Sequence, residues 1–333
     1  MRIAAIDLGS NTVKLSVADV NHSPTPRESG TLNTLGAPHE LDAKDAPVDP
    51  ITIIEERAAV TRIGERLDVT GHLQPEAIER TLSALRQFAE RARALGVDKL
   101  GCVGTAGLRG AANAPSFLER VETETGIRIE IIDGLREAGL SFHAAATAYG
   151  PGEILVLDVG GRSTELILGS GAGIEGRVSM EIGSVRLTER FVRNDPPHLD
   201  ELDNVRRAVR SALSKAPAIP SNSTNQPSLI GVSGTIMSVM GVALDLDDMR
   251  QAVAEGEGQT LRLATIQAIF EDLRRKTTPE RVRGTVIPEG RADVIVSGIA
   301  IMLEVLAHYG LDAMRASNRG VRYGLLQELA SIA

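Results

Sequence analysis

The sequence predicts a two-domain α/β fold, with a mixed β-sheet and flanking helices in each domain and a cleft between the domains. The chain has 333 residues, about twice the ~150 residues of an ordinary domain. Strand and helix patterns alternate along it, which is typical of α/β proteins. A strand–glycine turn–strand unit also occurs twice, at residues 7–12 and 158–164. Such a repeat, half a chain apart, indicates two copies of one architecture.

The first domain is expected to span residues 1–133. Arg2–Asp7 and Thr12–Val20 have the apolar pattern of two strands paired as a hairpin. Five prolines between Ser23 and Pro50 predict a long irregular excursion. Glu76–Leu95 has apolar residues at helical spacing, with a proline before it and a glycine after it. The remaining predicted elements are a strand at Lys99–Gly104, a helix near Ala114–Thr125 and a strand at Arg128–Ile132, an order that implies a parallel sheet.

The second domain is expected to span residues 134–317, and a C-terminal helix at about 318–333 is expected to pack back on the first domain. A helix at Arg136–Tyr149 opens the second domain, and the hinge is placed at Asp133–Ile154. The further predicted elements are strands at Ile154–Asp158, Thr164–Leu168 and Ser228–Val232, and an apolar helix after a third glycine turn at Gly231–Thr235.

The composition excludes several classes of partner. The chain has 36 basic and 44 acidic side chains and a net charge of −8, so it lacks the electrostatic footprint of a protein that binds nucleic acid or an anionic membrane. Aromatic residues make up 2% of the chain and tryptophan is absent, so stacking platforms for single-stranded bases are not available either. We expect a globular protein that binds any polyanion locally, in a pocket.

The single cysteine and the N-terminal residues indicate in which cellular compartment the protein is expected. Cys102 alone excludes an internal disulfide and every cysteine-based zinc site, and its apolar neighbours favour a buried thiol. None of the six histidines has the spacing of a metal-binding motif. Residues 1–7 are predicted to form a strand and lack the apolar core of a signal peptide, and no window approaches 18 unbroken apolar residues. We expect a cytoplasmic protein, with a homodimer left open.

Glycine turns between strands are suited to binding phosphate. Glycine permits backbone conformations in which several N–H groups point at one anion, and a Cβ would block the approach of a phosphate. Hydroxyl groups in the two turns add donors, and an aspartate at the end of a strand can hold hydrated Mg²⁺. Each turn alone could be no more than a tight hairpin. Two copies and a third glycine turn favour a clamp around a phosphate chain.

Motifs of one known family follow one another in order over nearly the whole chain. They lie at Asp7–Thr12, Thr61–Gly64, Gly104–Asn113, Ile131–Leu140, Asp158–Leu166, Ile182–Arg193 with Asp195–Pro197, Gly231–Thr235, Arg291–Ile295 and Ser317–Leu325. In this series the chain resembles the Ppx/GppA family of exopolyphosphatases and guanosine pentaphosphate phosphatases, within the actin, Hsp70 and sugar-kinase superfamily. The resemblance implies two actin-like (ribonuclease H-like) domains. It also implies Mg²⁺ as cofactor, with Mn²⁺ as the alternative, and inorganic polyphosphate or a guanosine alarmone as substrate.

The resemblance also implies a role for each site residue. Water would attack a terminal phosphoanhydride, which requires a carboxylate to align the water and donors for the phosphoryl oxygens. Glu137 stands at the position of the family's catalytic carboxylate, and Arg109 matches an arginine that faces the phosphate path. Asp158 and Glu165 would face the metal, with Asp7 as the matching carboxylate of the first turn. The phosphate contacts implied are Gly9, Ser10, Asn11, Thr12, Gly160, Gly161, Arg162, Ser163, Thr164, Gly234 and Thr235.

More ordinary roles stay open for several of these residues. Asp158 could be a strand-end cap, Glu165 a solvated strand residue and Arg109 a partner in a surface ion pair. Arg319 and Arg322 could reach a phosphate, but basic side chains on a C-terminal helix are more often only solvated.

The chain departs from the family pattern beside the expected site. Leu135 and Arg136 precede Glu137 where acidic residues are usual, so we expect Arg136 to lower the pKa of Glu137. Gly139 replaces a customary arginine. Arg162 stands where glycine is usual, and it either donates to a phosphate or fills the turn with its own bulk. Asn318 and Tyr323 stand where Asp and Glu are usual, and the His-Gly pair of the family is absent from Asp245–Gly258.

The predicted function is an exopolyphosphatase that hydrolyses the terminal phosphoanhydride of inorganic polyphosphate, with Mg²⁺ and a water aligned by glutamate. The alternatives are a guanosine pentaphosphate 5'-phosphohydrolase, and a weakly active or non-catalytic regulator that binds polyphosphate or an alarmone. A kinase of the same superfamily would need an adenosine pocket and an acceptor base, and the sequence identifies neither. The chain ends soon after the two domains, which favours shorter polyphosphate chains or a nucleotide.

Overall fold

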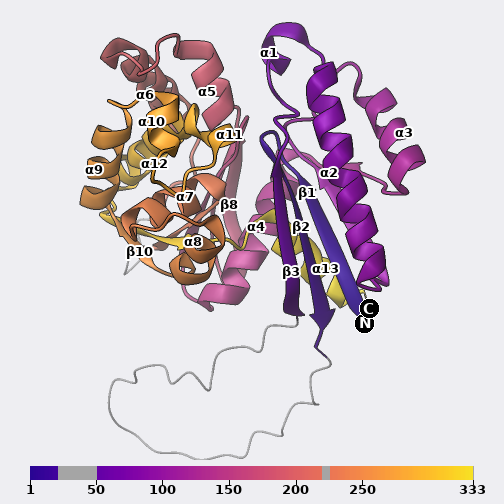
Figure 1. Cartoon of the computed structure of the whole chain (residues 1–333). Helices are drawn as coiled ribbons and strands as arrows, with labels where there is room; N and C mark the ends of the chain where they lie inside the picture. The colour runs from indigo at the N-terminus through magenta and orange to yellow at the C-terminus, as the bar shows by residue number, and fades with distance from the viewer. Residues whose placement is uncertain (22–50, 220–225, 333) are drawn as a thin grey trace, which may run out of the picture.

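Two β-sheets organise the molecule. The computed structural model describes residues 1–21, 51–219 and 226–332. The first domain surrounds a five-stranded sheet of order β3-β2-β1-β4-β5, and the second surrounds a six-stranded sheet of order β10-β11-β9-β6-β7-β8 (Figure 1). The strands are β1 (Arg2–Leu8), β2 (Thr12–Val20), β3 (Ile51–Val60), β4 (Lys99–Gly104), β5 (Glu130–Ile131), β6 (Ile154–Val159), β7 (Thr164–Ser170), β8 (Gly173–Met180), β9 (Ser228–Val232), β10 (Thr260–Arg262) and β11 (Ala313–Ser317).

Helices cover both sheets. They are α1 (Leu67–Thr70), α2 (Pro75–Ala94), α3 (Ala114–Thr125), α4 (Gly134–Tyr149), α5 (Ser184–Phe191), α6 (Leu199–Leu213), α7 (Gly234–Ala243), α8 (Met249–Gly256), α9 (Leu263–Leu273), α10 (Thr278–Val282), α11 (Glu289–Ala292), α12 (Ile295–Tyr309) and α13 (Val321–Ser331). Within the described ranges, no helix is both long and apolar enough to cross a membrane.

The predicted strand–turn–strand repeat is confirmed by the strand register. β1 pairs antiparallel with β2, which sets Asp7 opposite Lys14, and β6 pairs antiparallel with β7, which sets Asp158 opposite Glu165. β1 also runs parallel to β4, and β4 runs parallel to β5, as the order of elements predicts. The predicted strand at Arg128–Ile132 is shorter than expected, because only two of its residues pair with β4.

The two hairpins are also closed and supported in the same way. In each, a glycine amide donates to the carbonyl three residues later, at 3.2 Å in the first hairpin and 3.0 Å in the second. Backbone amides within residues 61–64 donate to carbonyls of the first hairpin, and amides of residues 184–186 donate to carbonyls of the second. Each hairpin therefore rests on a segment that follows it in the same domain.

Helix α4 is shared by the two domains. Leu140 and Ala144 on one face pack into a buried cluster with β1 and with α13. Ala138 and Phe142 on the opposite face pack against β6, β7 and β9. In Figure 1, α13 lies beside the strands of the first domain, so the end of the chain contributes to the core in which the chain begins. This arrangement places the first turn of α4 between the two sheets.

Most of the predicted helices are confirmed. α2 and α3 lie where the helical spacing places them, and Cys102 is buried as expected. The predicted excursion at Ser23–Pro50 lies outside the described residues. The strands β3, β8, β10 and β11, and most helices of the second domain, were not predicted. Helical spacing was available for at least α6, where Leu202, Val205 and Val209 lie on one buried face.

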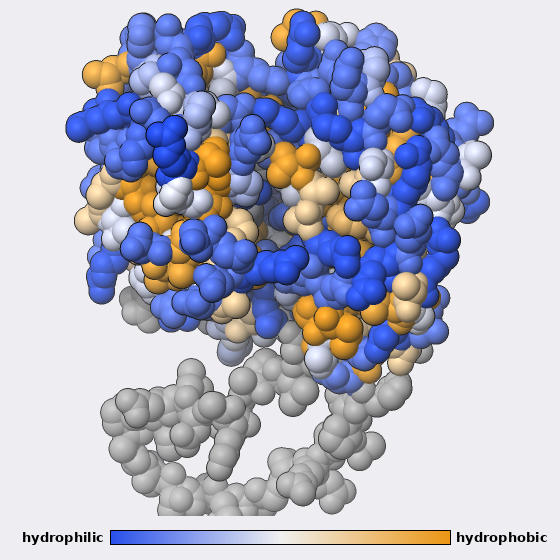
Figure 2. All heavy atoms as spheres, viewed as in Figure 1, coloured by the Kyte–Doolittle hydropathy of each residue, from blue (hydrophilic) through white to orange (hydrophobic). Residues whose placement is uncertain are grey.

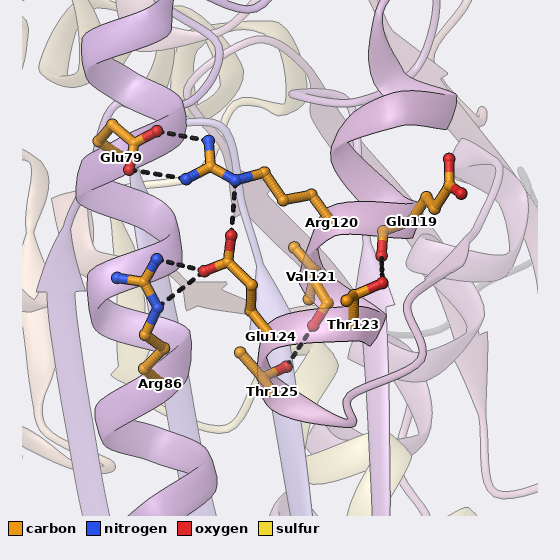
Figure 3. A network of polar contacts seen from close by, with 8 residues as sticks. All are labelled: Glu79, Arg86, Glu119, Arg120, Val121, Thr123, Glu124 and Thr125. Carbon is orange, nitrogen blue, oxygen red and sulfur yellow. Dashed lines mark hydrogen bonds and ion pairs between the residues drawn. The ribbon is translucent and has the colours of Figure 1, made fainter.

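Ion pairs attach α3 to α2 on the outer surface of the first domain (Figure 3). Arg120 of α3 donates to Glu79 of α2 at 3.0 Å and to Glu124 at 2.6 Å. Arg86 of α2 donates to Glu124 at 2.9 Å. The hydrogen bonds from these arginines lower the pKa of both glutamates. The charged groups here are paired with one another and partly exposed.

Candidate active site in the interdomain cleft

The two glycine hairpins face each other across a pocket between the domains, and Figure 2 shows the surface hollowed along this division. A Cβ on Gly161 would lie 3.2 Å from the Cβ of Ser10 and 3.5 Å from that of Asn11. A Cβ at this position would press against the first hairpin, so glycine lets the two hairpins lie this close without strain. In the part of the chain that the structure describes, the amides of Ser10, Asn11 and Gly161 donate to no backbone carbonyl, so they are available to an anion.

Most of the residues predicted from the sequence come together in this pocket. All of the expected phosphate contacts line it except Arg162 and Thr164. The carboxylates of Asp7, Glu137 and Asp158 line it as well.

Glu137 lies at the floor of the pocket, in the first turn of α4, and is 7% exposed. Nη1 of Arg109 donates to its Oε2 at 2.9 Å and to the carbonyl of Ile132 at 3.0 Å. Burial raises the pKa of Glu137 to about 8, although the charge of Arg109 opposes the shift, and the charge of Asp158 adds to it. A carboxyl with a pKa in this range is mostly protonated at neutral pH, and the ionised form that can take a proton from water predominates only above about pH 8.

The expectation that Arg136 lowers the pKa of Glu137 is wrong. The guanidinium of Arg136 pairs with Glu328 of α13 at 2.8 Å, and Leu135 is exposed. The cation that contacts Glu137 is Arg109, and burial outweighs it.

Three further carboxylates surround Glu137. Asp158 accepts a hydrogen bond from Ser141 at 2.8 Å, and burial raises its pKa to about 6. Glu165 accepts a hydrogen bond from Ser179 at 2.7 Å. Burial is the largest cause that raises the pKa of Glu165, and the charge of Glu137 is the second. Glu165 is buried beside the pocket and does not line it. Burial also raises the pKa of Asp7.

This donor set fits a magnesium ion held by few protein ligands. Among the described residues, no group of three or more His, Cys, Asp or Glu side chains is arranged to hold a metal. Mg²⁺ usually takes only one or two carboxylates and completes its shell with waters and phosphate oxygens. Asp158 and Asp7 line the pocket, and Oδ1 of Asp7 is buried without a hydrogen-bond partner. One or two carboxylates are therefore available for such an ion.

Two cations reach the pocket that the sequence analysis did not select. Lys14 comes from β2, two residues after Thr12 and so on the same face of the strand. Arg291 comes from α11 and packs against Gly234, where a Cβ would lie 2.3 Å from its Nη2. Nη1 of Arg291 donates to Ser238 at 2.9 Å. Burial lowers the pKa of Lys14, and it lowers that of Arg291 to about 10, so the arginine stays charged near neutrality.

Comparison with known proteins identifies the family of the chain. The sequence model of the Ppx/GppA phosphatase family matches residues 42–332. The chain belongs to the Ppx/GppA phosphatase family. Exopolyphosphatase 2 of Mycobacterium tuberculosis is 29% identical over 347 residues, which cover 99% of this chain and 98% of the relative.

Solved structures agree as well. The crystal structure of the Aquifex aeolicus family member is 29% identical with a TM-score of 0.74, and the match covers 100% of this chain and 98% of that one. An exopolyphosphatase from Cytophaga hutchinsonii, 24% identical, has the same fold with a TM-score of 0.83, over 100% of this chain and 99% of that one. The predicted two-domain α/β fold is confirmed, as is the prediction of an enzyme of this phosphatase family.

Two residues of this Ppx/GppA phosphatase do not lie where phosphate contact requires. The side chain of Arg162 leaves the second hairpin away from the pocket, donates to the carbonyl of Gly64 at 3.0 Å and pairs with Asp68. It therefore neither fills the turn nor points at a phosphate. The hydroxyl of Thr164 donates to the carbonyl of Ile182 at 2.6 Å, which occupies its only proton.

The C-terminal arginines do not line the pocket either. Arg322 pairs with Glu56 of β3 at 2.7 Å, and Arg319 lies 3.9 Å from Glu257. Asn318 just before them does line the pocket.

Proposed function

We propose that this Ppx/GppA phosphatase is an exopolyphosphatase that releases the terminal phosphate of inorganic polyphosphate in the presence of Mg²⁺. One observation carries the proposal: Glu137 lies beside Asp158 at the floor of a cleft whose two walls each present a glycine hairpin. The name of the Mycobacterium tuberculosis relative, an exopolyphosphatase, supports the same substrate class.

Glu137 is the general base of the proposed reaction. Its carboxylate takes a proton from a water that attacks the terminal phosphorus in line with the departing phosphate chain. Arg109 holds the carboxylate by one oxygen, Oε2, which leaves Oε1 for the water. The reaction needs no covalent intermediate, in agreement with the absence of a serine–histidine pair among the described residues that line the pocket.

The remaining pocket groups hold the phosphate chain. Free amides of the two hairpins and the hydroxyls of Ser10 and Thr235 donate to phosphoryl oxygens, while Lys14 and Arg291 supply positive charge. Asp158 and Asp7 would hold Mg²⁺, which withdraws charge from the phosphoryl oxygens when it is bound. These interactions stabilise the charge that develops during transfer.

The lining of the pocket favours an inorganic chain over a nucleotide. None of the described residues that line it is aromatic, and a guanine base is usually stacked on an aromatic or guanidinium plane. The one guanidinium among these residues, that of Arg291, is buried and donates to Ser238. Guanosine pentaphosphate remains the second candidate, because the anhydride chemistry at Glu137 would be the same. The case for a non-catalytic regulator rests on the departures from the family pattern at Arg162, Leu135 and Arg136. The guanidinium groups of Arg162 and Arg136 are held away from Glu137, and Leu135 is exposed.

A phosphate-release assay on three substrates tests the proposal. Long polyphosphate, short polyphosphate and guanosine pentaphosphate are compared at equal concentration of phosphoanhydride bonds, with and without Mg²⁺. We expect Mg²⁺-dependent release from polyphosphate at a higher kcat/KM than from the nucleotide. Faster release from guanosine pentaphosphate would select the second candidate. Thermal stabilisation by polyphosphate without any release would select the regulator.

A further inference from the structure

Arg162 crosses from the second domain into the first. It belongs to the second phosphate hairpin, yet its guanidinium donates to the carbonyl of Gly64 at 3.0 Å and pairs with Asp68 of α1. The side chain is 1% exposed although it bridges two domains. The fit is close, because a Cβ on Gly64 would lie 2.8 Å from Cδ of Arg162.

Asp68 also binds a second arginine of the second domain. Its Oδ2 lies 2.9 Å from Nε of Arg186 in α5, and Arg186 pairs in addition with Glu181 of its own domain. One carboxylate of the first domain therefore lies between two guanidinium groups of the second. Close by, the amide of Arg66 donates to Glu189 of α5 at 2.8 Å.

The segments joined by these contacts are those that support the two phosphate hairpins. The amide of Gly64 donates to the carbonyl of Ser10 in the first hairpin at 3.0 Å, and the amide of Arg186 donates to the carbonyl of Gly161 in the second at 3.0 Å. Through these bonds, the separation of Asp68 from Arg162 and Arg186 is coupled to the separation of the two hairpins.

The charges make Asp68 the critical member of this cluster. Burial lowers the pKa of Arg162, and the charge of Arg186 lowers it further, while the charge of Asp68, and after it that of Glu189, opposes both effects. Without the carboxylate, two neighbouring cations would remain, one of them buried, and such an arrangement is strongly unfavourable. Separation of the domains would relieve it by admitting water.

On the basis of this geometry, we propose that Asp68, shared by Arg162 and Arg186, is an interdomain latch that sets the distance between the two phosphate hairpins. Asp68 and Arg162 are thus positioning residues for the proposed phosphatase site, on whose function the kinetic part of the proposal rests. A second ion pair, between Arg62 and Asp293, also joins the two domains. It contains one cation and one anion, so it has no carboxylate shared between two arginines.

The latch predicts an unusual order of effects among variants. Asp68→Asn leaves the buried guanidinium of Arg162 without its ion-pair partner beside the cation of Arg186, and opens the cleft. Arg162→Met has a smaller effect, because Asp68 keeps Arg186. In the double variant Asp68→Asn/Arg162→Met the repulsion is gone, so the cleft closes again in part. Asp68→Glu retains the charge and preserves closure.

A distance measurement tests the latch without any reference to activity. Spin labels are placed at Glu119→Cys in α3 and Leu199→Cys in α6, both exposed, while the native Cys102 is buried and remains unlabelled. We expect one narrow distance distribution in the parent chain. In Asp68→Asn the distribution becomes longer and broader, and it returns toward the parent in the double variant. The matched control is Glu181→Gln, which removes a partner of Arg186 within the same domain and leaves the distribution unchanged.

Kinetics provide the second readout. A smaller closed population weakens apparent substrate binding in proportion, so Asp68→Asn raises KM for polyphosphate about tenfold with little change in kcat. A distance distribution and KM in Asp68→Asn equal to those of the parent would overturn the latch. If the parent itself releases no phosphate, the proposed function fails, and the distance measurement still decides the latch.

Discussion

Acidic side chains behave in opposite ways in two regions of this molecule. On the outer surface of the first domain, Glu79 and Glu124 each contact guanidinium groups, and these hydrogen bonds lower the pKa of both carboxylates (Figure 3). In the cleft, burial raises the pKa of Glu137 and Asp158. Glu137 also contacts an arginine, so the difference lies in desolvation rather than in the presence of a partner.

This difference separates carboxylates that support the fold from those suited to chemistry. A paired surface carboxylate is easily satisfied and contributes little beyond its local contacts. A buried carboxylate with a raised pKa is costly to keep charged, and such groups concentrate at functional sites. The contrast predicts that substitutions in the cleft change activity much more than stability, and that substitutions between α2 and α3 have only small effects on either.

The largest expected effect is that of Glu137→Gln. Loss of the general base lowers kcat for phosphate release about 10²–10⁴-fold. Stability does not fall with it. The pKa of Glu137 is about 8 in the folded protein and 4.5 in the unfolded chain. The free energy of unfolding therefore includes the full contribution of the protonated carboxyl below pH 4.5, and this contribution is lost as the pH rises from 4.5 to 8. The amide has no such loss, so melting curves at pH 8 should show a variant at least as stable as the parent.

The next effect concerns the metal. Asp158→Asn removes a charged ligand candidate, and the Mg²⁺ concentration for half-maximal activity should rise at least about tenfold. Ser141→Ala, which deletes only the hydrogen bond to Asp158, should give a smaller rise. A titration of activity with Mg²⁺ after chelation measures both. Equal Mg²⁺ requirements in the parent and Asp158→Asn would remove Asp158 from the metal site.

The smallest effect is expected on the surface of the first domain. Arg120→Ala deletes the bridge from Glu79 to Glu124, and the melting temperature should fall by about 2 °C or less. The residual contribution should shrink further in 1 M salt, because exposed pairs are screened. Phosphate release should be unchanged. A large loss of activity in this variant would mean that the two regions are coupled, against the comparison.

Local patterns were sufficient to predict much of the fold. The strands of both hairpins and the helices α2 and α3 follow from periodicity and from glycine and proline at their ends, because these signals lie within the element itself. Most residues of the pocket could also be predicted from the sequence, because each hairpin carries its own glycines and hydroxyl groups.

The directions of long side chains could not be predicted in the same way. The partner of Arg162 lies 94 residues away in the sequence and that of Arg136 lies 192 residues away, and both contacts exist only once the domains or helices have packed. Arg291 reaches the pocket for the same reason. Lys14 was within reach of sequence analysis, because strand alternation places it on the face of Thr12.

The pH dependence of kcat/KM tests the central assignment most directly, because it reports the pKa of the base in the free enzyme. For polyphosphate hydrolysis by the parent, kcat/KM should rise with pH through an apparent pKa far above the usual 4.5 of glutamate, near 8. Arg109→Gln should move this limb to higher pH, because the charge of Arg109 favours the ionised carboxylate. An acid limb near pH 4.5, or one that Arg109→Gln leaves in place, would contradict Glu137 as the base.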